Sequence, residues 1–73
     1  MDVEKIKALF VAVELGSLNQ AAEALQYSQA GLTHMMHSLE KEVGFQLLHR
    51  GYNGVSLTED AKRLAPTIRK LIL

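Results

Sequence analysis

The chain has no cysteine and no tryptophan, a single proline, and only 5% aromatic residues. The absence of cysteine excludes disulfides and cysteine-based metal sites. No apolar run approaches the roughly 18 residues that a membrane-spanning helix needs. The amino terminus, "MDVEKIK", also lacks the apolar block of a signal peptide. These absences predict a soluble, cytoplasmic domain with no membrane contact.

The chain also lacks an excess of charge of either sign. Eight basic and eight acidic residues give a formal net charge of zero. Between residues 27 and 58 the formal charges are Lys41 and Arg50 against Glu40 and Glu42, so this segment is neutral as well unless histidines protonate. We read the two glutamates as a solvated face near a helix end. A neutral chain is not a generic polyanion binder, and any nonspecific affinity for DNA is expected to be weak and sensitive to salt.

What the chain does have is apolar residues at helical spacing. Its 73 residues are 48% hydrophobic, enough for the core of one small domain. Asp2 is placed to cap a first helix that ends near Leu15, because its carboxylate can accept from free amides of the first turn. The predicted buried face of that helix, with Leu9 beside it, comprises Val3, Ile6, Phe10 and Val13.

Two further helices follow, separated by a short turn at residues 26–28. The first begins at Ser17, where Gln20 completes a capping-box pattern. The second spans about Gln29 to Val43. Its predicted core side comprises Leu32, Met36, Leu39 and Val43. The opposite side comprises Ala30, Thr33, His34, His37, Ser38 and Lys41. That side is rich in hydrogen-bonding groups and poor in charge.

From residue 45 the pattern changes from helix to hairpin. Two short apolar segments flank "GYNG", in which Asn53-Gly54 is typical of a tight turn, so we predict a two-stranded wing. Thr58 then caps a last helix, which Pro66 is expected to bend. The chain ends within an apolar stripe of that helix, so we expect it to be a fragment of a longer protein. The stripe comprises Leu64, Ile68, Leu71 and Ile72.

The predicted order is helix, short helix, turn, helix, hairpin, helix. This order is typical of a helix-turn-helix, which projects its second helix into the major groove of DNA. We therefore predict a mainly α fold: a winged helix-turn-helix with a three-helix core, a two-stranded β wing and the start of a linker helix. The alternative is a winged-helix module for protein–protein contact or self-association, favoured by the neutral helix face and the apolar last helix.

Specific motifs carry the interpretation further. The chain has "GS" followed by "AAEAL", then "SQ" with Leu32, then "LEKEVG", "LLHR" and "VSLTE", in that order. In these motifs it resembles the amino-terminal domain of the LysR-type bacterial transcriptional regulators. The resemblance implies a DNA-binding domain over residues 1–58, with the helix-turn-helix at about 17–43 and the wing at about 45–58. Residues 59–73 would begin the linker helix that pairs subunits.

The resemblance also implies partners and site residues. The partners are double-stranded DNA, a second subunit held through the stripe of the last helix, and a small effector bound by a domain absent from this chain. The implied DNA-contacting residues are Ser28, Gln29, Ala30, Thr33, His34, His37, Lys41, Arg50 and Asn53. Tyr52 lies beside Asn53 at the wing tip.

The helix departs from the family where charge is expected. His34 and His37 stand at positions that are usually or commonly basic, and Ala30 stands where proline or serine is usual. A neutral imidazole offers one donor and one acceptor, whereas arginine can fork to both acceptors of guanine. We expect protonation of the two histidines to strengthen DNA binding at pH 6 relative to pH 8.

Metal binding and catalysis have little support in the sequence. His34 and His37 are three residues apart on a helix, but a third ligand does not lie near them in the sequence. Motifs that frame a catalytic nucleophile or cradle a phosphate are missing, so we predict a protein that is not an enzyme and needs no metal or cofactor.

Overall fold

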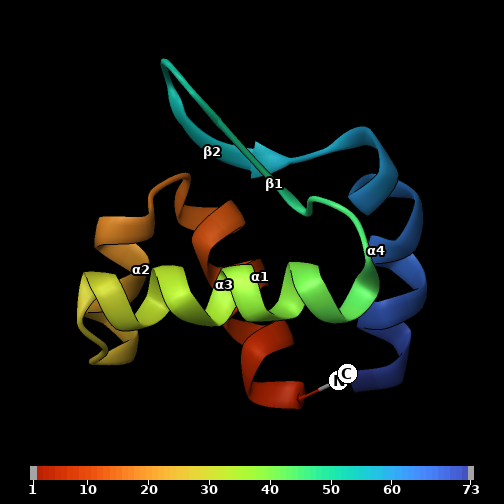
Figure 1. The fold of residues 1–73 in the computed structure, drawn as a ribbon, viewed down its shortest axis with the longest axis horizontal. Coiled ribbons are helices and arrows are strands. Elements are labelled where there is room, and N and C mark those ends of the chain that lie inside the picture. Colours follow the sequence, from red (N-terminus) through yellow and green to blue (C-terminus); the bar gives the residue numbers. More distant parts are fainter. Residues whose placement is uncertain (1, 73) are drawn as a thin grey trace.

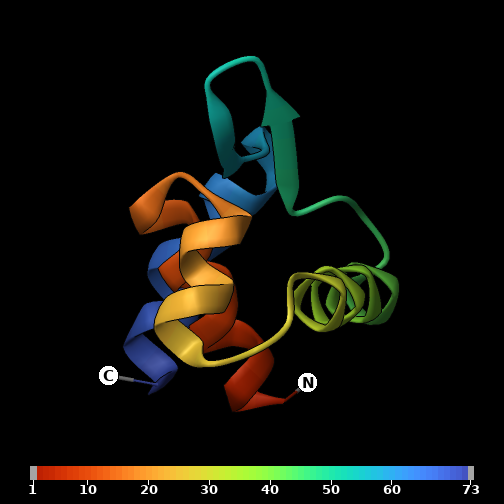
Figure 2. The same cartoon turned by 90° about the vertical axis from the view of Figure 1, so that its left-hand side faces the viewer.

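The computed structural model describes residues 2–72, with side chains described as far as Lys70. The elements are α1 (Val3–Leu15), α2 (Leu18–Leu25), α3 (Gln29–Val43), β1 (Leu48–Gly51), β2 (Gly54–Leu57) and α4 (Glu59–Ile72). This order confirms the predicted mainly α fold with a two-stranded wing. Figure 1 shows the hairpin projecting from the helices, and Figure 2 shows α3 end-on along one side of the molecule. None of the helices described between residues 2 and 72 is long and apolar enough to cross a membrane.

The core lies where α1, α2 and α3 meet, and it extends under the wing and the start of α4. Its members are apolar side chains that are at most 8% exposed. They are Ile6, Ala8, Leu9, Ala12, Leu18, Ala21, Ala22, Leu32, Met36, Leu39, Leu47, Leu48 and Ala61. The core side of α3 is confirmed in Leu32, Met36 and Leu39, and Val43 packs against the core half-buried.

The predicted buried face of α1 is partly wrong. Val3 is 47% exposed, and Phe10 and Val13 are only half-buried. The buried face includes Ala8 and Ala12 instead. Small side chains let a neighbouring helix approach closely, so the alanines mark the line of contact on α1. The face of α1 predicted from its large apolar residues is therefore rotated about the helix axis relative to the face that is buried.

The helix caps form largely as predicted. Asp2 Oδ1 accepts from the Glu4 amide at 3.0 Å, and Ser17 Oγ accepts from the Gln20 amide at 3.1 Å. The second half of the capping box is different, because the Ser17 amide donates to the Ala12 carbonyl at 3.2 Å. That bond belongs to the end of α1, so the α1–α2 corner is held by backbone contacts.

The wing is an antiparallel hairpin with Leu48 opposite Leu57 and Arg50 opposite Val55. Its turn is followed by Gly54 at φ 110°. The Val55 amide donates to the Gly16 carbonyl at 3.2 Å, and a Cβ at Gly54 would collide with that carbonyl oxygen. The start of β2 is therefore pinned against the α1–α2 corner.

Helix α4 follows the wing and buries Ala61, near its start, in the core. Thr58 Oγ1 accepts from the Ala61 amide at 3.2 Å, which confirms the predicted cap. The helix continues through Pro66 without interruption. Farther along, the Arg69 guanidinium lies over the Phe10 ring, 4.5 Å from its centroid. Contacts at both ends thus hold α4 to the domain.

Candidate nucleic-acid interface

Helix α3 is fixed by one side and leaves the other in solvent. Leu32, Met36 and Leu39 are at most 2% exposed and dock it on α1 and α2. On the other side the exposed residues are Gln29, Ala30, His34, His37 and Lys41. The structure thus presents most of the predicted α3 residues on one accessible face.

The start of α3 combines a side-chain cap with open backbone amides. Ser28 Oγ accepts from the Gly31 amide at 2.9 Å, while its hydroxyl hydrogen stays available as a donor. Ser28, Gln29 and Ala30 are all exposed. The amino end of a helix carries partial positive charge, so this end favours an anion even though it has no basic side chain.

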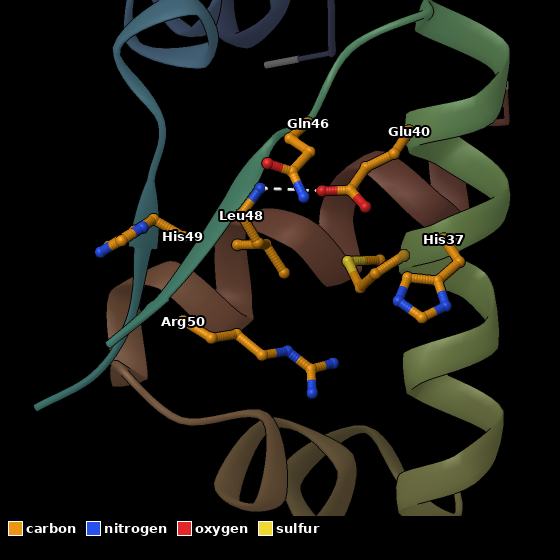
Figure 3. Close-up of a pocket in the computed structure, with 7 residues that line it drawn as sticks. His37, Glu40, Gln46, Leu48, His49 and Arg50 are labelled. Carbon is orange, nitrogen blue, oxygen red and sulfur yellow. Dashed lines mark hydrogen bonds between the residues drawn. The ribbon is translucent and has the colours of Figure 1, made fainter. Parts of the chain in front are cut away.

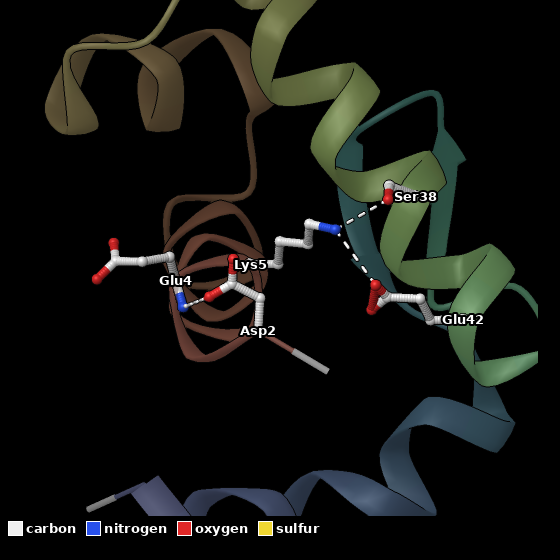
Figure 4. A network of polar contacts seen from close by, with 5 residues as sticks. All are labelled: Asp2, Glu4, Lys5, Ser38 and Glu42. Carbon is white, nitrogen blue, oxygen red and sulfur yellow. Dashed lines mark hydrogen bonds and ion pairs between the residues drawn. The ribbon is translucent and has the colours of Figure 1, made fainter.

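Two side chains of α3 are less accessible than expected. Thr33 is half-buried, so it lies at the border of the exposed face. Ser38 was expected on that face and is not there: its Oγ accepts from Lys5 Nζ of α1 at 2.9 Å (Figure 4). Lys5 Nζ also lies 3.2 Å from a carboxylate oxygen of Glu42. The carboxyl half of α3 is covered by α1 on this flank, which turns Ser38 away from solvent.

A cleft of about 360 Å³ separates the exposed face of α3 from strand β1. Its lining residues are Met36, His37, Glu40, Gln46, Leu48, His49 and Arg50. Figure 3 shows His37 and Arg50 extending into the space between α3 and β1, whereas His49 points away on the other side of the strand. Arg50 carries a permanent positive charge, and the imidazole adds a hydrogen-bonding group on the facing wall. The cleft therefore brings together one predicted residue from the helix and one from the wing.

The sequence-based reading of Glu40 as part of a solvated face is wrong. Its Oε2 accepts from the amides of Leu47 and Leu48, at 2.8 Å and 3.0 Å. Buried backbone amides need acceptors, and those of residues 47 and 48 have no helix to supply them. That demand, together with an acidic residue one helical turn before the end of α3, is the signal that would have found this contact.

The remaining predicted residues lie apart from the cleft. Asn53 and Tyr52 form the exposed tip of the wing, which projects away from the helices (Figure 1). On α4, Leu64 is 40% exposed, whereas Ile68 is half-buried against the core of its own domain. The side chains of Leu71 and Ile72 lie outside the described residues.

The described part of the chain holds no group of three or more histidine, cysteine, aspartate or glutamate side chains that could bind a metal ion. The exposed His34 and His37 remain a pair on one face of α3. Both side chains lie on an open surface, where they can form hydrogen bonds with a partner molecule.

Helices α2 and α3, the turn between them and the adjoining β hairpin together define a winged helix-turn-helix. Residues 3–62 match the family model described as "Bacterial regulatory helix-turn-helix protein, lysR family". The chain belongs to this family, which is one of DNA-binding transcriptional regulators.

Curated relatives support the assignment over nearly the whole chain. The nitrogen assimilation regulatory protein nac of Klebsiella aerogenes is 38% identical over 72 residues, which is 99% of this chain and 24% of nac. The HTH-type transcriptional regulator YbhD of Escherichia coli K12 is 35% identical over 71 residues, 97% of this chain and 22% of YbhD. The chain thus spans about a quarter of the length of these relatives.

Solved structures show the same fold. The CbnR_DBD–DNA complex matches with a TM-score of 0.88 and 29% identity, over 99% of this chain and 83% of that one. The complex of BenM_DBD with benA site 1 DNA matches with a TM-score of 0.88 and 30% identity, over 99% of this chain and 81% of that one.

Proposed function

We propose that this chain is the DNA-binding part of a bacterial transcriptional regulator, and that α3 reads a specific double-stranded site from the major groove. The observation that carries this proposal is the accessible, hydrogen-bonding face of α3 beside a wing, in a fold shared with the CbnR_DBD–DNA complex. Helix-turn-helix proteins place base-reading side chains near the amino end of the second helix. In this chain those positions are uncharged.

Base reading is assigned to three residues of α3. Gln29 and His34 are exposed and can each donate and accept a hydrogen bond. The hydroxyl of the half-buried Thr33 can reach a base or phosphate, and its methyl group can meet the methyl group of thymine. The amide of Gln29 is suited to the paired donor and acceptor of adenine.

Phosphate contacts are assigned to groups around this reading face. Ser28 and the amide of Ala30 lie at the positive end of α3, and His37 and Lys41 lie farther along its exposed side. Arg50 on β1 and Asn53 at the wing tip are assigned to the backbone or the minor groove beside it. Such contacts set the register of the helix on the duplex.

Pairing of two subunits would present two copies of α3 to an interrupted, roughly palindromic site. We assign this contact to α4, through Leu64, Ile68, Leu71 and Ile72. Ile68 already packs on its own domain, which leaves Leu64 as the more accessible of the two described members. An effector would bind a separate domain of the longer regulator, and the site of action would be the cytoplasm. We assign no catalytic role.

Alanine at Thr33 and His34 together tests the proposal. We expect the double variant to lose at least tenfold in affinity for its duplex, because good base contacts are worth about 1–3 kcal/mol each. Competition binding and sedimentation report DNA affinity and oligomeric state on the same sample. His49→Ala is the matched control, since this exposed histidine lies on the far side of β1. Altered self-association with unchanged DNA affinity would instead support the alternative of a protein–protein module.

A further inference from the structure

Glu40 connects the reading helix to the wing. It lies in the last part of α3, is half-buried, and accepts through Oε2 from the amides of Leu47 and Leu48. Figure 3 shows the hydrogen bond from Leu48. Leu48 is the first residue of β1. One carboxylate oxygen therefore anchors the place where the wing strand begins.

The same segment is held from the other side by the start of α4. The Thr58 amide donates to the Leu47 carbonyl at 2.9 Å, and the Thr58 hydroxyl donates to the Gln46 carbonyl at 2.7 Å. Leu47 and Leu48 are buried, at 4% and 8% exposure. Residues 46–48 are thus fixed between Glu40 of α3 and Thr58, while the rest of the hairpin projects outward.

The anchored segment leads directly to Arg50. Side chains two apart on a strand point to the same side, so Leu48 and Arg50 share a face of β1. Figure 3 shows both directed toward α3. Holding the Leu48 amide at Glu40 consequently fixes where the backbone of Arg50 lies relative to α3, and with it the side from which the guanidinium approaches the cleft.

By its charge alone, Glu40 would weaken DNA binding. Its negative charge lies in the same cleft as Arg50 and His37, where a phosphate group would be repelled. If charge is all that matters, removing the carboxylate should strengthen DNA binding. If the carboxylate holds the start of the wing in place, removing it should weaken DNA binding. A substitution of Glu40 therefore distinguishes the two roles by the sign of the change in affinity.

We propose that Glu40 is a positioning residue for DNA binding: its carboxylate holds the start of the wing so that Arg50 and the exposed face of α3 engage the same duplex. The inference rests on the proposed function and adds a residue that itself does not touch DNA. Substituting Glu40 weakens binding although it removes a negative charge.

The test compares Glu40→Ala with Glu42→Ala. Glu42 lies on the same helix and carries the same charge, but its partner is Lys5 of α1. Affinity is measured by fluorescence anisotropy, at low salt, on the duplex enriched from random DNA by the wild-type chain. We expect Glu40→Ala to weaken binding about tenfold, and Glu42→Ala to leave it unchanged or slightly stronger.

A double-mutant cycle with Arg50→Ala shows whether Glu40 acts through Arg50. Once Arg50 is gone, we expect Glu40→Ala to cost less than about twofold. Equal losses with and without Arg50, or a Glu40→Ala affinity equal to that of Glu42→Ala, would overturn the inference. A wild-type chain that binds no duplex overturns the proposed function itself, which is a separate outcome.

Amide hydrogen exchange without DNA measures the anchor directly. Glu40→Ala should speed exchange at Leu47 and Leu48, while the core amides of α1 keep their protection. Should alanine unfold the chain, Glu40→Asp serves instead, because it keeps the charge but withdraws the carboxylate by one methylene from the amides of Leu47 and Leu48. We then expect weaker binding than in Glu42→Asp, and an affinity equal to or above that of Glu42→Asp would contradict the positioning role.

Discussion

Single residues decide what kind of DNA reader this domain is. His34 stands on the exposed face of α3, with His37 one turn farther along. A neutral imidazole has one donor and one acceptor, so it can adapt to several base edges but binds none of them as strongly as a forked guanidinium binds guanine. Recognition by this face therefore depends on several moderate contacts together.

Contacts between residues close in the sequence can be predicted from it, whereas contacts between distant residues cannot. The caps at Asp2 and Ser28 were predictable, because a helix amino end and its acceptor lie within three residues of each other. The partners of Glu40 and Ser38 lie outside α3, 7 and 33 residues away in the sequence. No periodicity encodes such contacts, so the sequence placed both side chains in solvent.

Elements were predicted more reliably than their contacts. The bounds of α3 follow directly from Ser28 at one end and Gly44 at the other, and the structure confirms them. The contact face of α1 was displaced because Ala8 and Ala12, not the larger side chains, lie at the closest approach. Which face an element buries depends on its neighbours, and a single stretch of sequence does not contain them.

The junction between the wing and the α1–α2 corner depends on one glycine. Gly54 has φ 110° and lies against the Gly16 carbonyl. We expect Gly54→Ala to lower the free energy of unfolding by about 3 kcal/mol, since it adds backbone strain and a clash with backbone. Urea unfolding followed by circular dichroism measures the change.

Gly44→Ala separates the two causes of that loss. Gly44 also has a positive φ, of 88°, but a Cβ there meets nothing within 4 Å. Its substitution should therefore cost only about 1 kcal/mol, the strain of a left-handed residue. Equal losses at the two glycines would show that the close approach to Gly16 contributes nothing.

The molecule as a whole combines a winged helix-turn-helix fold with a lack of net charge. A formal net charge of zero leaves little of the sequence-independent attraction that most DNA-binding domains have. Under the proposed function, affinity then comes from the fit of α3, the placement of the wing and the proposed pairing of two subunits, which would gain avidity from adjacent half-sites. Sequence specificity is consequently the property on which the account depends most.

The most direct test of that property is selection of random duplex DNA on the folded domain, paired through α4, at low salt and near pH 6.5. We predict enrichment of an interrupted palindrome, and a change of base within each half-site when His34→Arg is selected in parallel. A shift toward guanine at that position is the expected form of the change. No enrichment from a folded, paired domain, or an identical site for both proteins, would contradict base reading by α3.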